Sequence, residues 1–388
     1  MISLIVYISK PTYVAYAQDD MSQEELEQEL KNNIVDQLDS LDFSKLDEIL
    51  SNLSDSQFKI FGSPSFITKL KQIINGDFGN SYSNFFEYIF NLIFDDMLEC
   101  LPALCMIVAI SIVCSFFGSV GSDKSNKTIS NLLYFVCFSV IVVIVFSLVK
   151  GVVLGTSSVI DLIKKQMDII FPILLTLITS MGNVVTVSAF QPAIALLTTG
   201  IIHIFTTIMI PLFIFSVVFN VVGNISPNIR LEKCSKFCSS VFKWIIGSIF
   251  TIFIAILTIQ GITAGAIDGV SIKTAKFALK SYVPVLGGYL SDGINLIVAS
   301  SVLIKNAVGA TGLVLLFATV IVPVVKIAIF SLGLKLVAAI VEPLSENKIS
   351  NFLYGVSKCL SMLITCLIAI GFMYLIVVGL IMCMANAF

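Results

Sequence analysis

Charge is scarce in this chain. Only 12% of its 388 residues are Asp, Glu, Lys or Arg, whereas 57% are hydrophobic and the mean hydropathy is +1.00. A single soluble core of this length needs far less apolar surface, so the composition excludes an ordinary soluble protein. It predicts an all-α polytopic integral membrane protein, which lies in the lipid bilayer and has no nucleic-acid partner.

The residues of common catalytic sites are also missing. The chain has one His, His203, inside an apolar run, so no His-based catalytic or metal cluster can form. We expect this His to be buried and bonded to a neighbouring helix. The nine Cys are scattered through apolar runs and are interpreted as small hydrophobic residues. Because no Walker A motif is present, any ATPase must be a separate subunit, and we expect no enzyme activity and no cofactor.

The few charges divide unevenly along the chain. Residues 18–99 carry 17 acidic residues against 5 Lys, whereas residues 100–388 carry 17 Lys and Arg against 8 acidic residues. This asymmetry predicts that the two parts lie in different compartments. Residues 18–97 pattern as short amphipathic helices, which form either a solvated cap or an arm that binds a partner.

The start of the chain resembles an export signal. The apolar run 2–8 is followed by Ala15-Tyr16-Ala17, a site of the kind that signal peptidase accepts. Residues 1–17 are therefore predicted to be a signal peptide, with an uncleaved anchor as the alternative. Either reading places the acidic segment outside the cytoplasm.

Six stretches are long enough to cross about 30 Å of hydrocarbon. We predict spans near 98–118, 131–155, 193–222, 242–267, 308–341 and 352–384. Two further apolar stretches, 169–190 and 282–303, have a Pro near the start and an interruption by Gly or Asn. Each is either a full span or a re-entrant hairpin. With span 98–118 carrying Lys124 to the cytoplasm, the hairpin is favoured because it places Arg230 and Lys348 on the same side.

A duplicated unit lies within the membrane part. Residues 164–211 align without a gap to residues 276–323, with 11 identities that include Ser188/Ser300, Thr207/Thr319 and Pro211/Pro323. We therefore expect an internal repeat with broken or re-entrant helices. The predicted organisation is a signal peptide (1–17), an acidic helical segment (18–97), a first helix and loop (98–126), repeat 1 (127–232), repeat 2 (233–347) and a last helix (348–388).

Polar and helix-breaking residues at membrane depth are the candidate functional residues. A charge within hydrocarbon costs about 3 kcal/mol or more, so it normally faces protein or water. Pro residues remove a backbone donor, and Thr-Gly pairs let helices approach closely. On these grounds a transport path or a helix break is expected at Asn183, Asn295, Lys305, Asn306, Pro211, Pro323, Gly200 and Gly312.

The second repeat resembles a known family. The resemblance lies in the runs Phe277-Ala278-Leu279-Lys280-Ser281-Tyr282-Val283-Pro284-Val285-Leu286-Gly287-Gly288-Tyr289-Leu290-Ser291-Asp292 and Leu303-Ile304-Lys305-Asn306-Ala307-Val308-Gly309. Both runs are similar to the stage III sporulation protein AE family of endospore-forming bacteria. The resemblance implies a multi-pass subunit of the mother-cell-to-forespore channel, located in the mother-cell membrane around the forespore. It implies other stage III sporulation A-operon membrane proteins as partners.

The sequence is compatible with two functional classes. In the first, the chain is permease-like, and Asn183, Asn295 and Lys305 line a path for small molecules. In the second, it is a membrane scaffold that assembles the complex without forming a path itself. A homo-oligomer and an ATPase acting in trans are compatible with both.

Overall fold

The computed structural model describes residues 23–76, 85–120, 127–225, 231–282, 286–343 and 347–384, which form helices joined by short turns, without a strand. The predicted signal peptide lies outside the described residues. Four short helices come first: α2 (Gln23–Asp39), α3 (Ser44–Ser51), α4 (Asp55–Phe61) and α5 (Phe66–Ile74). Five long helices carry most of the chain: α6 (Phe85–Val120), α7 (Lys127–Ser180), α11 (Glu232–Tyr282), α12 (Leu286–Val341) and α13 (Asn347–Cys383).

Between α7 and α11 the chain forms one long rod from five consecutive helical pieces. These are α8 (Val184–Ala195), η1 (Leu196–Ile201), α9 (Ile202–Ile204), η2 (Phe205–Met209) and α10 (Ile210–Ile225). The pieces η1 and η2 are π-helical: Ile202 N–H donates to the carbonyl of Leu197, and Ile210 N–H to that of Phe205, five residues back in each case. We refer to residues 184–225 as the α8–α10 rod.

Six helices in the described part of the chain are long and apolar enough to cross a membrane. The chain thus has the helices of a multi-pass membrane protein, as its composition predicts. α7, α11 and α12 contain 54, 51 and 56 residues. At 1.5 Å per residue each is about 75 to 85 Å long, more than twice the roughly 30 Å of hydrocarbon. These helices must therefore tilt strongly or continue beyond the bilayer.

The two ambiguous apolar stretches do not form elements of their own. The first consists of the end of α7, a turn at residues 181–183 and the start of α8, and Gly182 takes a left-handed φ of 86° in that turn. The second coincides mostly with the first turns of α12. The two copies therefore change direction at different points, although Asn183 and Asn295 align in sequence.

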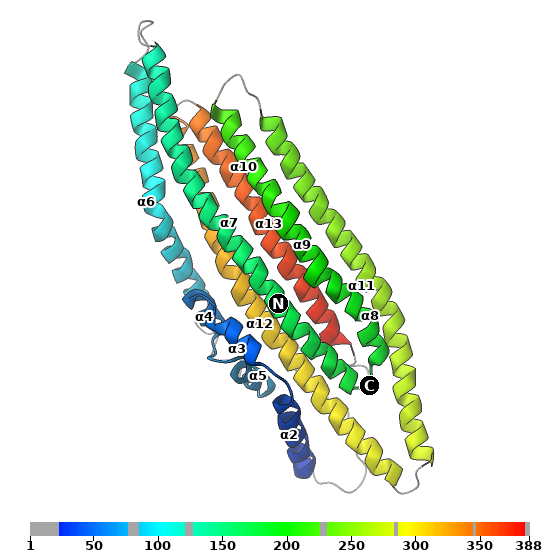
Figure 1. The fold of residues 1–388 in the computed structure, drawn as a ribbon. Helices are drawn as coiled ribbons and strands as arrows, with labels where there is room; N and C mark the ends of the chain where they lie inside the picture. The colour runs from blue at the N-terminus through cyan, green and yellow to red at the C-terminus, as the bar shows by residue number, and fades with distance from the viewer. Residues whose placement is uncertain are drawn as a thin grey trace.

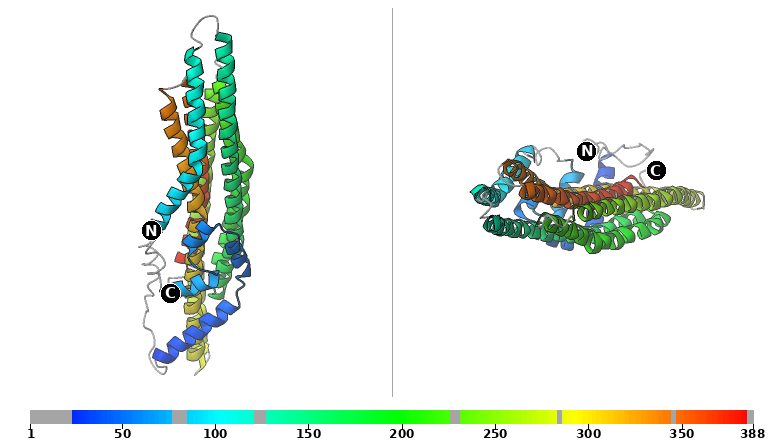
Figure 2. Two further views of the ribbon diagram at one scale, coloured as in Figure 1. Left: turned by 90° about the vertical axis from the view of Figure 1, so that its left-hand side faces the viewer. Right: turned by 90° about the horizontal axis from the view of Figure 1, so that it is seen from above.

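The long helices run alternately up and down in a flattened bundle of two layers (Figures 1 and 2). The starts of α7, α11 and α13 lie together at the upper end in Figure 1, and each start has a lysine: Lys127, Lys233 and Lys348. α12 lies at the centre of the packing, because it contacts α6, α7, α11 and α13 as well as α2, α4 and α5.

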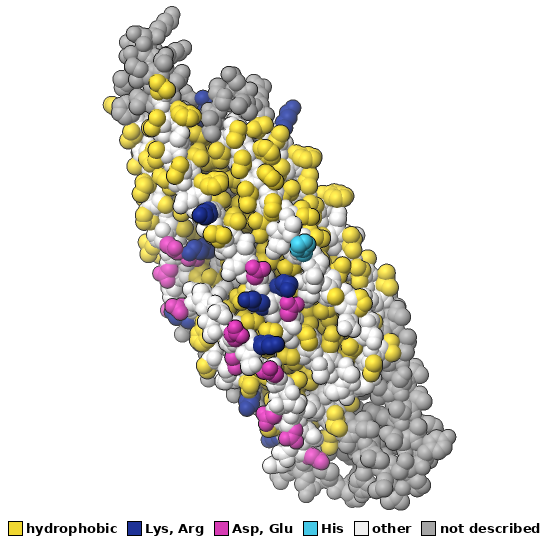
Figure 3. Space-filling model, in the orientation of Figure 1, with side chains coloured by type: hydrophobic (Ala, Val, Ile, Leu, Met, Phe, Trp, Pro, Cys, Tyr) yellow, Lys and Arg dark blue, Asp and Glu magenta, His cyan; other side chains and the backbone are white. Residues whose placement is uncertain are grey.

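The N-terminal helices α2–α5 form a small domain that packs along the lower half of α12 and beside α7 (Figure 1). Its interior is apolar, with Leu46, Phe61, Phe66 and Leu70 fully buried. Gly62 ends α4 in the left-handed conformation, as the Gly62-Ser63-Pro64 sequence suggests. Charged side chains gather over these helices and the neighbouring part of α7, whereas the upper part of the same face is mostly hydrophobic (Figure 3). The acidic segment and the basic helix ends therefore lie at different levels of the bundle.

The chain stays helical at both of the equivalent prolines, Pro211 and Pro323. α12 continues as an α-helix through Pro323, so the expectation of a break there is wrong. The physical reason is that α12 is packed on several sides, and a side chain from α4 donates to the carbonyl that Pro323 leaves without a donor. At Pro211 the helix also continues, but it winds as the π-helix η2 immediately before the proline.

The aligned glycines Gly200 and Gly312 have different surroundings. A Cβ on Gly312 would lie 3.0 Å from Ile170 Cδ1 on α7 and 3.3 Å from Tyr374 Oη on α13, so this glycine is the point where three helices meet. A Cβ on Gly200 would approach only Leu196 of its own helical rod, at 3.7 Å. Close helix packing therefore applies to the second copy alone.

This difference generates a matched prediction. Gly312→Val is expected to lower the free energy of unfolding by about 1 to 3 kcal/mol, because the added methyl groups force α7 and α13 apart. Gly200→Val carries the same helix propensity change without the steric conflict and is expected to cost less than about 1 kcal/mol. Thermal unfolding of the two purified variants in one detergent checks this, and equal losses would contradict it.

Candidate functional site: the polar seam of α12

Buried polar side chains follow one another along α12. Those that are fully buried are Ser300, Ser301, Lys305, Thr311 and Thr319. Polar groups in an apolar environment are costly unless they are hydrogen-bonded, so their partners show what this row of residues does. We call these five residues the α12 seam.

Lys305 connects the seam to the end of the last helix. Its Nζ donates to the carbonyl oxygen of Met382 at 3.1 Å and also to that of Met384. α13 ends at Cys383, where the last carbonyls have no partner within the helix and the helix dipole favours a positive charge. One turn further along, a Cβ on Gly309 would lie 2.7 Å from Met382. Lys305 therefore fastens α12 to α13 at a point of close approach.

Two glutamines of the N-terminal domain bind the two ends of the seam. Gln37 on α2 donates through Nε2 to Ser300 Oγ at 2.9 Å and accepts through Oε1 from Ser301 Oγ at 3.0 Å. Gln57 on α4 donates through Nε2 to the carbonyl oxygen of Thr319 at 3.1 Å. The acidic segment is thus attached to α12 by specific polar contacts in addition to its apolar packing.

α7 meets the same two ends of the seam from another side. Gln166 is fully buried and donates through Nε2 to Thr319 Oγ1 at 2.7 Å, and Ser180 Oγ lies 3.2 Å from Ser301 Oγ. The seam therefore joins three parts of the chain: the N-terminal domain, α7 and α12 itself.

The three asparagines among the candidate residues do not share one environment. Asn183 is buried at the start of α8, and its Nδ2 has no hydrogen-bond partner among the described residues. Asn295 is exposed in the early turns of α12. Asn306 is half-buried next to Lys305, and within the described chain its Oδ1 is sheltered without a partner. The contrast with Lys305 is clear, because the hydrogen bonds of that lysine connect two helices.

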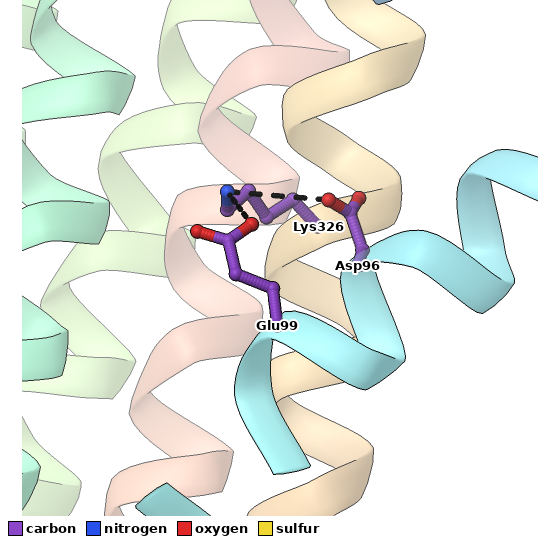
Figure 4. A network of polar contacts seen from close by, with 3 residues as sticks. All are labelled: Asp96, Glu99 and Lys326. Atoms are coloured by element: carbon purple, nitrogen blue, oxygen red, sulfur yellow. Dashed lines mark hydrogen bonds and ion pairs between the residues drawn. The ribbon is translucent and has the colours of Figure 1, made fainter. Parts of the chain in front are cut away.

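An ion cluster links α12 to α6 beyond the seam. Lys326 Nζ lies 2.7 Å from Glu99 Oε2 and 3.9 Å from Asp96 Oδ1 (Figure 4). Both acids belong to the lower part of α6, and Lys326 and Glu99 are largely exposed. Exposed pairs of this kind contribute little to stability, so the cluster aligns α6 with α12 more than it stabilises the fold.

An open groove of about 420 Å³ lies between α7 and the first part of the α8–α10 rod. Its polar lining consists of Asp168, Thr176, Thr179, Gln191 and Thr198. Asp168 is paired with Lys164 at 3.1 Å across one turn of α7. A second groove, of about 390 Å³, lies where α2 meets α7 and α12 and includes Gln37 and Ser180. The first groove, unlike the second, shares no lining residue with the seam contacts.

His203 does not have the surroundings expected from its sequence. It is exposed on α9, and its Nδ1 lies 3.4 Å from Thr207 Oγ1 of the same rod, so the expectation of a buried contact with another helix is wrong. The residue faces outward because the apolar side of α9 is occupied by Ile202, which packs inward. Within the described residues, no group of His, Cys and acidic side chains could hold a metal ion.

The chain is similar to proteins of a known family. The family model described as stage III sporulation protein AE matches residues 65–385. The chain belongs to the stage III sporulation protein AE family. Membership of this family implies a role in sporulation. The stage III sporulation protein AE of Bacillus subtilis (strain 168) is 24% identical over 307 residues, which cover 79% of this chain and 76% of that protein. No solved structure matches the chain.

The match includes the whole seam and the helices from α5 to α13, whereas it begins after α4. Sequence reasoning missed the three glutamines that bind the seam. A signal for Gln57 existed, because Ser54-x-x-Gln57 is a capping-box pattern that fixes the orientation of the amide. Gln166 and Gln37 carried no comparable pattern. Their role depends on residues more than 150 positions away.

The seam contacts generate a second matched prediction. Lys305→Met is expected to lower the free energy of unfolding by about 2 to 3 kcal/mol, because a charged donor to two helix-end carbonyls is lost. Lys326→Met, on the same helix, is expected to cost less than about 1 kcal/mol because the lysine and its nearer partner, Glu99, are exposed. Chemical or thermal unfolding in detergent compares the two, and a larger loss for Lys326→Met would contradict this assignment.

Proposed function

We propose that the chain is a membrane subunit of the mother-cell-to-forespore channel complex and acts there as a scaffold. This proposal is based on the hydrogen bonds that connect the α12 seam to other helices. Lys305, one of the residues expected to line a path, instead binds the end of α13. Gln37 and Gln57 bind the acidic segment to α12. A rigid joint of this kind suits a subunit that presents a fixed surface to partners.

The proposed placement puts the subunit in the mother-cell membrane around the forespore. The starts of α7, α11 and α13, with Lys127, Lys233 and Lys348, then face the cytoplasm, and α2–α5 lie on the opposite side. The grouping of these basic ends at one end of the bundle supports this orientation. The excess length of α7 and α12 then extends into the space between the two membranes.

The internal duplication is part of the same proposal. In it, residues 127–232 and 233–347 are tandem halves that face the same way, and the stretch 169–190 turns back without crossing the bilayer, whereas residues 286–303 belong to the continuous helix α12. The turn at 181–183, which sends α8 back along α7, supports this arrangement for the first half. A signal peptide at 1–17 would deliver the acidic segment to the outer side.

The proposed partners follow from the family. They are the other stage III sporulation A-operon membrane proteins, a second copy of this chain, and an ATPase subunit that acts in trans if the complex is energised. We assign the chain no enzymatic activity and no nucleic-acid partner.

A permease-like role is the second candidate. The groove between α7 and α8 supports it, because Asp168, Gln191 and Thr198 give this surface a polar lining inside two otherwise apolar helices. Such a surface could form part of a path only after another subunit or a second copy had enclosed it.

Two sets of substitutions separate these roles. Gln37→Leu with Ser301→Ala loosens α2 from α12, whereas Gln191→Leu with Thr198→Val makes the groove apolar without touching the seam. A scaffold predicts that the first pair lowers both the yield of heat-resistant spores and the recovery of partner subunits with the tagged chain. It predicts that the groove pair leaves both near normal. If the groove pair abolishes spores while the partners still co-purify, the permease-like role is correct instead.

A further inference from the structure

Pro323 creates a specific defect in the hydrogen bonding of α12. In an α-helix, the N–H of each residue donates to the carbonyl four residues earlier, and proline has no N–H. The carbonyl affected by Pro323 belongs to Thr319, which is fully buried. Buried carbonyls without a donor are costly, and helices bend sharply at such points.

The missing donor comes from outside the helix. Gln57 Nε2 lies 3.1 Å from the carbonyl oxygen of Thr319 in a buried contact. The other end of the same amide is also engaged, because Gln57 Oε1 accepts from the Ser54 N–H at 3.0 Å while Ser54 Oγ accepts from the Gln57 N–H at 3.3 Å. The capping box of α4 therefore holds the amide in the one orientation that points its NH₂ at Thr319.

The aligned proline lies in a different setting. Thr207 and Pro211 repeat the Thr-x-x-x-Pro spacing, but Thr207 is exposed, whereas Thr319 is buried beneath Gln57. At the first copy the helix rewinds into the π-helical turn η2, in which Ile210 N–H reaches back five residues to Phe205. The same Thr-x-x-x-Pro spacing thus lies beside a π-helical turn at Pro211 and within a regular helix at Pro323.

We propose that α4 is a latch on α12. While Gln57 is docked, α12 runs regularly through Pro323; when α2–α5 detach, the Thr319 carbonyl loses its donor and α12 bends at the proline. The ion cluster of Lys326 with Asp96 and Glu99 lies just beyond this point, so the bend changes the angle between the two parts of α12 next to α6. A partner that captures the N-terminal domain would thereby change the shape of the membrane bundle.

The latch makes a prediction that a simple packing contact does not. Gln57→Glu keeps an oxygen for the Ser54 N–H but replaces the donor to Thr319 by an acceptor. This change is expected to lower the Tm by several degrees and to speed amide exchange in the turns beside Pro323 by about tenfold, the factor for one buried hydrogen bond. In a Pro323→Ala background, the substituted alanine supplies its own backbone N–H to Thr319, so most of both effects should disappear.

Thermal unfolding and hydrogen-exchange mass spectrometry of the full chain in detergent provide the two readouts. Gln37→Leu is the matched control, because it removes a docking contact far from Pro323. It should lower the Tm by the same amount in the parent chain and in the Pro323→Ala background. Gln57→Ala replaces Gln57→Glu if the acidic variant does not fold. Equal losses for the Gln57 variant in the parent chain and in the Pro323→Ala background would overturn the latch, as would unchanged exchange around Pro323.

Discussion

The fold depends on one constraint: every backbone carbonyl and every polar side chain inside a long apolar bundle needs a hydrogen-bond partner. α12 meets this constraint with partners from distant parts of the chain. Lys305 donates to the carbonyls at the end of α13. Gln57 donates to the carbonyl of Thr319, and Gln166 donates to the hydroxyl of the same threonine. Because these contacts cross between elements, they also determine which helices lie side by side.

This use of polar groups explains why the two aligned halves differ so much in structure. In the second copy, Thr319 and Gly312 are covered by α7, α13 and the N-terminal domain, whereas Thr207 and Gly200 of the first copy face outward or toward their own helix. The glutamines of α2 and α4 both bind the second copy. The sequence match between residues 164–211 and 276–323 is therefore compatible with a bundle in which a single helix, α12, makes most of the polar contacts between elements.

Much of the architecture was predictable because composition and periodicity act locally. The membrane class, six apolar helices and the short helices of the acidic segment all follow from local patterns. The course of α12 through Pro323 was not predictable, because it depends on Gln57, 262 positions away from Thr319. The partner of Lys305 is likewise 77 positions away. The alignment of Asn183 with Asn295 indicated equivalent breaks, but tertiary packing places the two turns differently.

The length of α12 has a mechanical consequence. Between Leu286 and Pro323 the helix is an unbroken rod of about 55 Å, because each residue adds 1.5 Å. A rod of this length acts as a lever: a kink of about 20° at its pivot would sweep the far tip sideways by roughly 20 Å. Losing a single hydrogen bond at the pivot would thus be amplified into a displacement wider than a helix.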